Sequence, residues 1–214
     1  MKKLLLTAVI AVMGVSMNAQ SFNFGLKAGY SLSTLNAKNS DYKYDSKSSF
    51  YAGALAEYKV SSKFALQAEL LYSQLGGESK YTESEAGVTY AESDNIKLGN
   101  LQIPVSAKYY ATEKLAFGVG VNFGIITSAK NEYSRSLSGG GYSESENGKE
   151  DIKNNVQKLN LAPFIGAEYT FYKGLFADAR YNLGVSNLIK NAEGNEKLTN
   201  GFFQIGLGYK FGGK

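Results

Sequence analysis

Apolar side chains occupy every second position in stretches of about ten residues, beginning shortly after residue 20. In the first stretch one parity reads Phe22, Phe24, Leu26, Ala28, Tyr30 and Leu32. A period of two is that of a β-strand, because successive side chains of a strand point to opposite faces. About ten residues is also the length with which a tilted strand crosses a bilayer. The pattern therefore predicts strands that cross a membrane.

Eight segments carry this alternation. We expect strands at residues 22–32, 50–60, 64–74, 98–110, 115–127, 157–171, 175–186 and 201–211. Three connections are of hairpin length, whereas four are long and polar, at residues 33–49, 75–97, 128–156 and 187–200. Short turns that alternate with long loops are typical of outer-membrane barrels. We predict an all-β fold, an eight-stranded antiparallel up-and-down transmembrane β-barrel, with the long connections as mobile surface loops.

The parity opposite the apolar one is rich in glycine, for example Gly25, Gly29, Gly118, Gly120 and Gly206. Glycine suits a narrow, crowded lumen, and larger polar residues would be expected on a face exposed to water. The alternative fold is a soluble barrel that holds a lipid and turns its apolar parity inward. The glycine pattern favours the membrane barrel, with its apolar parity toward lipid.

The chain begins with two lysines and an apolar run at residues 4–15, followed by a plausible processing site at Ala19. This is the composition of an export signal, and the run is too short for a membrane-spanning helix. We therefore expect two parts, a signal peptide at residues 1–19 and a barrel domain at residues 20–214.

Composition excludes several classes of function. Beyond the two N-terminal lysines, Lys and Arg are scattered singly, so the sequence predicts no nucleic-acid partner. Cysteine is absent, which excludes disulfides and thiolate metal sites. Glu144, Glu146, Glu150 and Asp151 cluster in one connection, but their spacing is not that of a calcium-binding loop. We predict no metal and no cofactor.

Seven charged residues fall on the inner parity of the expected strands. They are Lys27, Glu57, Glu69, Lys108, Glu168, Asp178 and Arg180. The interior of an eight-stranded barrel is just wide enough for side chains to fill it. We therefore expect these residues to form a structural ion network that plugs the lumen, with Lys59 and Lys210 near the rim at the turn side. The alternative is a proton or ion path.

Arg180 is the residue we expect to hold a carboxylate across the lumen, with Glu69 or Glu168 as the partner. A catalytic pair of carboxylates is the competing interpretation of these acidic residues. Activation of a serine nucleophile generally needs a histidine or a comparable base, and the chain contains no histidine. We predict no enzymatic activity and no catalytic residues.

Four motifs then suggest a family. They are GLKAG at residues 25–29, LQAELLYS at 66–73, LQIPV at 101–105 and ARYNLG at 179–184. With them the chain resembles the porin-like outer-membrane β-barrel family of small eight-stranded proteins, of OmpA/OmpX-type architecture. The resemblance implies a protein of the bacterial cell outer membrane in a Gram-negative organism, surrounded by lipid and inserted by the barrel assembly machinery. It implies no defined activity.

The functional expectation is an outer-membrane barrel with a plugged lumen. We expect a structural or surface-interaction role through the long external loops, which could hold an extracellular ligand, and a monomeric barrel. The alternative is a narrow porin or ion channel for small solutes.

Overall fold

The computed structural model describes residues 22–38, 44–192 and 194–211, so the expected signal peptide lies outside the described residues. One short 3-10 helix, η1 (Lys153–Asn155), accompanies nine strands in these ranges. None of the helical structure in these ranges is long and apolar enough to cross a membrane. The strands are β1 (Phe22–Lys38), β2 (Lys47–Lys59), β3 (Phe64–Glu85), β4 (Val88–Tyr110), β5 (Leu115–Gly139), β6 (Tyr142–Asp151), β7 (Leu159–Tyr172), β8 (Leu175–Asn182) and β9 (Lys197–Phe211).

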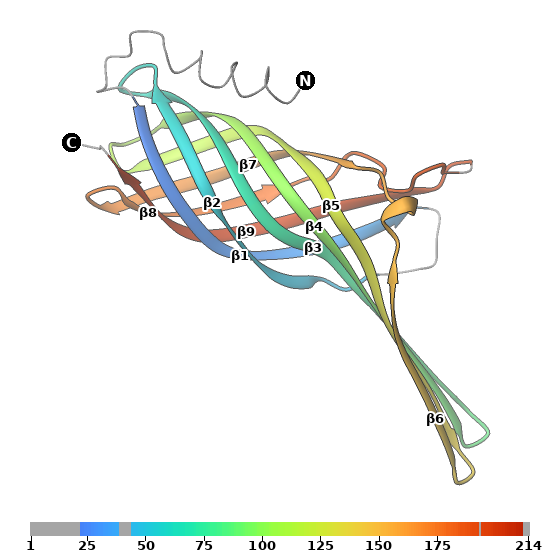
Figure 1. Cartoon of the computed structure of the whole chain (residues 1–214). Coiled ribbons are helices and arrows are strands. Elements are labelled where there is room, and N and C mark those ends of the chain that lie inside the picture. Colours follow the sequence, from blue (N-terminus) through green and yellow to red (C-terminus); the bar gives the residue numbers. More distant parts are fainter. Residues whose placement is uncertain (1–21, 39–43, 193, 212–214) are drawn as a thin grey trace.

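Eight of these strands close into a ring in the order β4, β3, β2, β1, β9, β8, β7 and β5, and β5 pairs again with β4 (Figure 1). All neighbours in the ring are antiparallel. The first and last strands form one seam, which runs from Phe24 opposite Phe211 to Lys38 opposite Lys197. The predicted eight-stranded antiparallel barrel is confirmed, and each expected strand overlaps an observed one.

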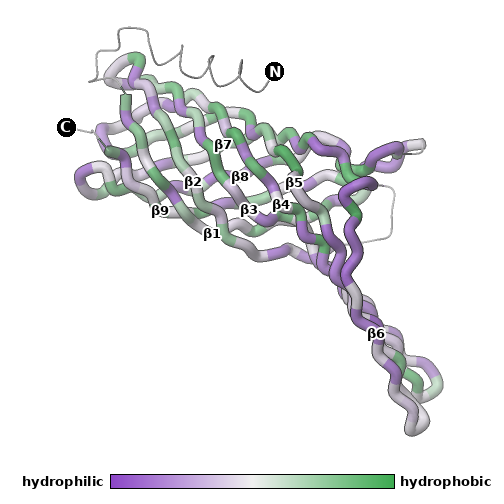
Figure 2. The backbone as a smooth tube through the Cα atoms, viewed as in Figure 1, coloured by the Kyte–Doolittle hydropathy of each residue, from purple (hydrophilic) through white to green (hydrophobic). Residues whose placement is uncertain are grey.

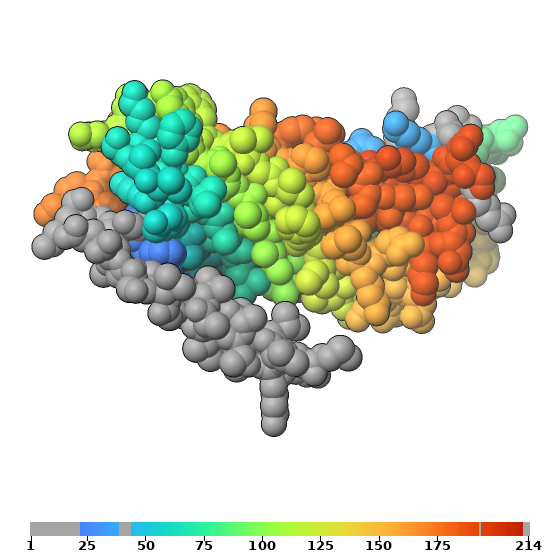
Figure 3. Space-filling model, turned by 90° about the horizontal axis from the view of Figure 1, so that it is seen from above, coloured from blue at the N-terminus to red at the C-terminus, as the bar shows by residue number. Residues whose placement is uncertain are grey.

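The apolar parity points outward. Leu26, Val119 and Ile165 are 57%, 61% and 66% exposed, whereas Lys27, which follows Leu26, is 4% exposed. Hydropathy therefore alternates along each strand of the barrel (Figure 2). Across one face of the space-filling view the colours pass from cyan through lime to orange and red, as neighbouring strands follow one another (Figure 3). This orientation excludes the soluble lipid-binding barrel and fits a wall in contact with lipid.

Inner glycines make room for two aromatic rings that lie inside the barrel. A side-chain carbon at Gly206 would overlap the Tyr51 hydroxyl, and one at Gly208 would overlap the ring of Phe176. Both rings are almost completely buried. The glycines thus let large side chains fill a lumen that eight strands make narrow.

Two of the four long connections are not loops, and our expectation of mobile loops at residues 75–97 and 128–156 is wrong. β3 and β4 continue as a hairpin to a turn at Ala86 and Gly87, and β5 and β6 to a turn at Gly140 and Gly141. These turn residues have φ values between 50° and 82°, as tight β-hairpin turns require. The two hairpins also pair with each other through β4 and β5, which stabilises both.

We call this four-stranded projection the arm and define it as residues 76–97 and 130–151. Its strands lie in the order β3, β4, β5, β6 and leave the barrel at the end opposite Phe22 and Phe211 (Figure 1). At about 3.3 Å per residue, nine residues beyond Gly76 reach about 30 Å. A single bridge between Asp45 and Glu78 supports the outer side of β3 at the base.

The segment between β8 and β9 folds over the barrel mouth on the arm side. The Leu188 amide donates to the Leu198 carbonyl at 2.7 Å, and the Gln157 amide donates to the Leu188 carbonyl at 2.8 Å. Leu188 is thereby buried in an apolar cap with four residues of β1, β4 and β5: Leu35, Leu98, Ile126 and Ala129. The cap covers that end of the lumen with hydrocarbon.

Candidate functional site

The lumen nearest the short turns holds a ring of two lysines and two glutamates, which we call the turn-side quartet. Lys108 Nζ lies 2.7 Å from Glu57 and 2.8 Å from Glu168, and Lys210 Nζ lies 2.7 Å and 2.6 Å from the same two carboxylates. All four residues are buried. The sequence placed Lys210 near the rim. Its long side chain instead reaches into the lumen, so that expectation is corrected.

A second group of four, the central quartet, lies farther along the lumen. Lys27 Nζ is 2.6 Å from Asp178 Oδ2 and 3.5 Å from Glu69 Oε2. Arg180 Nη2 is 2.7 Å from Glu69 Oε1 and 3.4 Å from Asp178 Oδ2. Each quartet contains two cations and two anions, so the buried charges balance within each group.

Gln67 joins the two quartets. Its Nε2 donates to Glu69 at 2.7 Å, and its Oε1 accepts from Lys108 Nζ at 3.1 Å. Tyr110 extends the network toward the turns, because its hydroxyl donates to Glu57 at 2.8 Å. The sequence analysis missed both residues. Gln67 shares the inner parity of β3 with Glu69, and this was the signal that could have identified it.

Every strand of the ring except β5 supplies a side chain to the quartets. β5 instead presents small inner residues at Ala116, Gly118 and Gly120. The alternation that turns apolar residues toward lipid also turns these charged residues inward. Burying charge costs free energy that pairing and hydrogen bonds must offset, and each of the eight charged groups lies beside a group of opposite charge. Asp178 Oδ1 and Arg180 Nη1 are buried without a hydrogen bond, so the central quartet is the less fully satisfied of the two.

Amide side chains fill the next layer toward the arm. Gln102 Nε2 donates to Ser73 at 2.6 Å, and Asn122 Nδ2 donates to Gln102 at 3.0 Å. On the opposite wall Gln204 donates to Ser31 at 3.1 Å. A cavity of about 30 Å³ lies between residues of the two quartets. A cavity of this size has room for about two water molecules, so side chains fill most of this part of the lumen.

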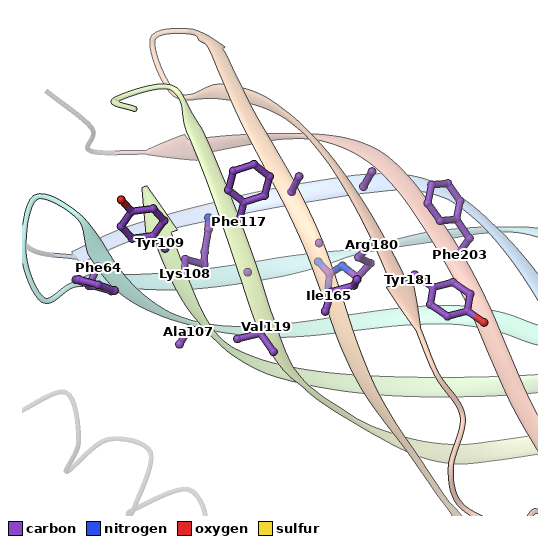
Figure 4. A pocket seen from close by; sticks show the side chains of 14 residues that line it. Phe64, Ala107, Lys108, Tyr109, Phe117, Val119, Ile165, Arg180, Tyr181 and Phe203 are labelled. Carbon is purple, nitrogen blue, oxygen red and sulfur yellow. The ribbon is translucent and has the colours of Figure 1, made fainter. Parts of the chain in front are cut away.

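The outer wall carries an open apolar groove of about 630 Å³ (Figure 4). Phe64, Tyr109 and Phe117 lie at one end, and Tyr181 and Phe203 at the other (Figure 4). Its floor is low because small residues face outward there: Ala107, Ala167 and Ala179. The groove belongs to the wall that faces lipid. Its outward side chains are uncharged, and the inward-pointing Lys108 and Arg180 also border it.

The strand register of the arm sorts its side chains onto two faces. Large side chains lie on one of them, which we call the tyrosine face: Tyr81, Val88, Tyr90, Tyr133, Leu137 and Tyr142. The opposite, hydroxyl face carries mainly serine and threonine toward the tip: Thr82, Ser84, Thr89, Ser93, Ser134, Ser136, Ser138, Ser143 and Ser145. Two chemically different surfaces therefore project from one end of the barrel.

A Tyr-x-Glu pair occurs three times on the tyrosine face. The hydroxyls of Tyr81, Tyr90 and Tyr142 donate to the carboxylates two residues ahead, at 2.7, 3.0 and 2.8 Å. The acceptors are Glu83, Glu92 and Glu144. Residues i and i+2 of a strand share a face, so each glutamate is held beside its tyrosine ring. Arg135 donates to Glu92 at 2.9 Å and lies 5.0 Å from the centre of the Tyr133 ring.

Ion pairs join the strands at the base of the arm. Glu132 on β5 accepts from Lys97 on β4 and from Lys149 on β6. These two hydrogen bonds lower the pKa of Glu132 from 4.5 to about 2. Lys47 on β2 donates to Asn95, which in turn donates to Glu78 at 3.1 Å. The base of the arm is therefore tied to the barrel by polar contacts.

The acidic residues of β6 that the sequence analysis considered as metal ligands are exposed on the arm, with Glu144, Glu146 and Glu150 on the tyrosine face. Over the described ranges, no group of three or more acidic, histidine or cysteine residues is arranged to hold a metal ion.

A family model described as "Outer membrane protein beta-barrel domain" matches residues 18–190. Among solved structures, the chain is similar to Ail, the attachment invasion locus protein of Yersinia pestis, with 15% identity over 89% of this chain and 99% of that chain and a TM-score of 0.47. It is also similar to Neisserial surface protein A (17% identity, 88% and 97% covered, TM-score 0.41) and to OprG from Pseudomonas aeruginosa (13% identity, 89% and 96% covered, TM-score 0.39). A search of curated proteins finds no match.

Proposed function

The chain belongs to the outer membrane protein beta-barrel domain family, and from that premise we propose that its barrel is a sealed anchor for the arm, which acts as a recognition surface. It is an integral protein of the bacterial outer membrane, and its apolar wall contacts lipid. In such barrels the short turns face the periplasm and the long connections face outward. The arm would therefore stand outside the cell.

The arm is the observation that carries this proposal. Four strands extend in register beyond the barrel, from Gly76 opposite Lys97 to Glu85 opposite Val88. A projection of about 30 Å is more than hairpin closure requires, since two residues suffice for a turn. Binding residues placed on a rigid scaffold are a common way to build a recognition surface.

The filled lumen favours the function of an anchor over that of a channel. A narrow porin or ion channel for small solutes is the competing function, and it needs a continuous polar path. The two neutral quartets, the amide layer and the apolar cap leave a cavity of only about 30 Å³ between the quartets. Open aqueous channels belong to wider barrels.

The proposal includes a monomeric barrel inserted by the barrel assembly machinery. The ring closes on itself, so it leaves no unpaired strand edge in the membrane that a second copy would have to cover. Family membership supports insertion by that machinery.

Removing the arm tests the proposed function. In the shortened variant, residues 78–95 and residues 132–149 are each replaced by Asn-Gly, which ends both hairpins at the row of Gly77, Ile96, Asn131 and Glu150. Vesicles that carry either protein are passed over immobilised poly-lysine, polyglutamate, heparin and dextran. We expect at least one surface to retain the full-length protein tenfold more than the shortened variant. In a second measurement, the conductance of the full-length protein is recorded in planar bilayers.

Two outcomes would overturn the proposal. The first is equal retention of both proteins on every surface while both barrels show heat-modifiable gel mobility. The second is reproducible stepwise conductance of the full-length protein, which would favour the channel.

A further inference from the structure

The tyrosine face presents large side chains to solvent. Tyr81, Leu137 and Tyr142 are 52%, 40% and 60% exposed, and Val88 is 43% exposed. A sheet in a compact domain normally buries one face against another layer. Exposed large side chains gathered on one face of a projection are typical of an interaction site.

Charge on the arm is concentrated on the same face. By the strand register, one guanidinium, Arg135, stands there among seven carboxylates: Glu83, Glu85, Glu92, Asp94, Glu144, Glu146 and Glu150. The opposite face is nearly balanced, with four lysines and three carboxylates: Lys80, Lys97, Lys130, Lys149, Glu78, Glu132 and Asp151. The tyrosine face therefore attracts cations and repels anions over its whole length.

The Tyr-x-Glu pairs give this face a second means of binding cations. In each pair the hydroxyl is engaged with the carboxylate, as in Tyr81 with Glu83 and Tyr142 with Glu144. The ring then lies beside a negative group, and a lysine or arginine placed over it gains both a cation–π contact and an ion pair. Neighbouring strands are about 4.8 Å apart, so such sites recur at intervals that side chains of a polypeptide can match.

We infer that the tyrosine face docks a cationic polypeptide, whose arginine and lysine side chains meet the Tyr-x-Glu pairs and whose apolar side chains cover Val88 and Leu137. This inference rests on the proposed function, because it names the partner of the arm. A polyanionic glycan would meet carboxylates at nearly every position. A neutral glycan would leave the strong negative field of this face unused.

The test compares two variants with the same change in net charge. Glu83→Gln/Glu144→Gln/Glu146→Gln removes three carboxylates from the tyrosine face, and Glu78→Gln/Glu132→Gln/Asp151→Asn removes three from the opposite face. Binding of poly-arginine to protein in neutral vesicles is measured at low salt. We expect about tenfold weaker binding for the first variant, from three exposed ion pairs, and less than threefold for the second. Added salt weakens the wild-type binding.

A third variant separates an oriented surface from diffuse charge. Tyr81→Leu/Tyr142→Leu keeps every charge and removes two rings, so we expect about fivefold weaker binding of poly-arginine. Hydrogen exchange in the arm establishes that each variant stays folded. The inference would be overturned if the two carboxylate variants lost the same amount of poly-arginine binding, or if the tyrosine variant lost none.

The outcomes also separate this inference from the proposed function. Arm-dependent capture of heparin or dextran without capture of poly-arginine would leave the arm as a recognition surface and overturn the cationic partner. No arm-dependent capture on any surface would overturn both.

Discussion

Arg180 Nη2 lies 2.7 and 2.8 Å from the two carboxylate oxygens of Glu69, although the residues are 111 positions apart in the chain. One nitrogen thus contacts both oxygens across the lumen. Glu69 stands on β3 and Arg180 on β8, which are not neighbours in the ring. The contact therefore links strands that share no backbone hydrogen bonds.

Removing the arginine should destabilise the barrel strongly. Arg180→Met leaves Glu69 and Asp178 with Lys27 alone, and breaking a buried pair costs about 3–5 kcal/mol. The double variant Arg180→Met/Glu69→Met restores charge balance and should recover most of that loss. The free energy of unfolding is measured by urea titration in lipid vesicles, followed by circular dichroism. A double variant no more stable than the single one would refute this account of the central quartet.

Lys210 and Lys59 should differ in importance, although both lie near the turn side. Lys210 contacts Glu57 and Glu168, so Lys210→Met leaves two buried carboxylates to share Lys108, and we expect a loss of about 3 kcal/mol or more. Lys59 is exposed and lies over the Tyr110 ring at 5.3 Å, so Lys59→Met should cost less than about 1 kcal/mol. The same urea titration compares them. Similar losses would show that Lys210 is not held in the lumen.

Two glycines on β5 provide a matched steric comparison. A side-chain carbon at Gly118 would lie 3.6 Å from Lys108, which is ordinary contact, whereas one at Gly120 would overlap the Val105 carbonyl and approach Ser106 and Phe164 within 3.0 Å. Gly120→Ala should therefore destabilise the barrel by about 1–3 kcal/mol, and Gly118→Ala should be near neutral. Heat-modifiable gel mobility gives the midpoint temperature of each variant. Equal midpoints would mean that the wall at Gly120 relaxes freely.

Acid should loosen the base of the arm. Because hydrogen bonds from Lys97 and Lys149 lower the pKa of Glu132 to about 2, the stabilisation is complete above its ordinary value of 4.5 and is lost as the pH falls through about 2. Hydrogen exchange of the arm, corrected for intrinsic rates, should quicken over this range relative to its rate at neutral pH. In the variant Glu132→Gln, hydrogen exchange of the arm should depend less on pH. If the pH dependence of exchange were the same in that variant as in the wild type, the effect would belong to other titratable groups.

The barrel was predictable because one property, alternation between lipid and lumen, repeats along every strand. The arm was not, since both of its faces meet water and carry polar residues, so no apolar period marks strands such as β6. Its strands depend on pairing between the two hairpins, for example Val88 opposite Gly139, and no local sequence pattern encodes that contact.

The charged site was partly predictable for a similar reason. Parity indicated which side chains point inward, but the choice between Glu69 and Glu168 as the partner of Arg180 depends on how the strands are staggered around the ring. The structure brings Glu69 to Arg180 and gives Glu168 to two lysines. Lys210 was misplaced because the position of its Cα near the rim does not fix where a long flexible side chain ends.

The seam between β1 and β9 has a kinetic consequence. Phe24 and Phe211 must meet across nearly the whole chain, so the cylinder cannot close until its last strand has been delivered. Contacts of such large sequence separation are intrinsically slow to form. Until then β1 exposes a row of unsatisfied amides and carbonyls, and the unfinished protein needs protection from aggregation during its passage to the membrane.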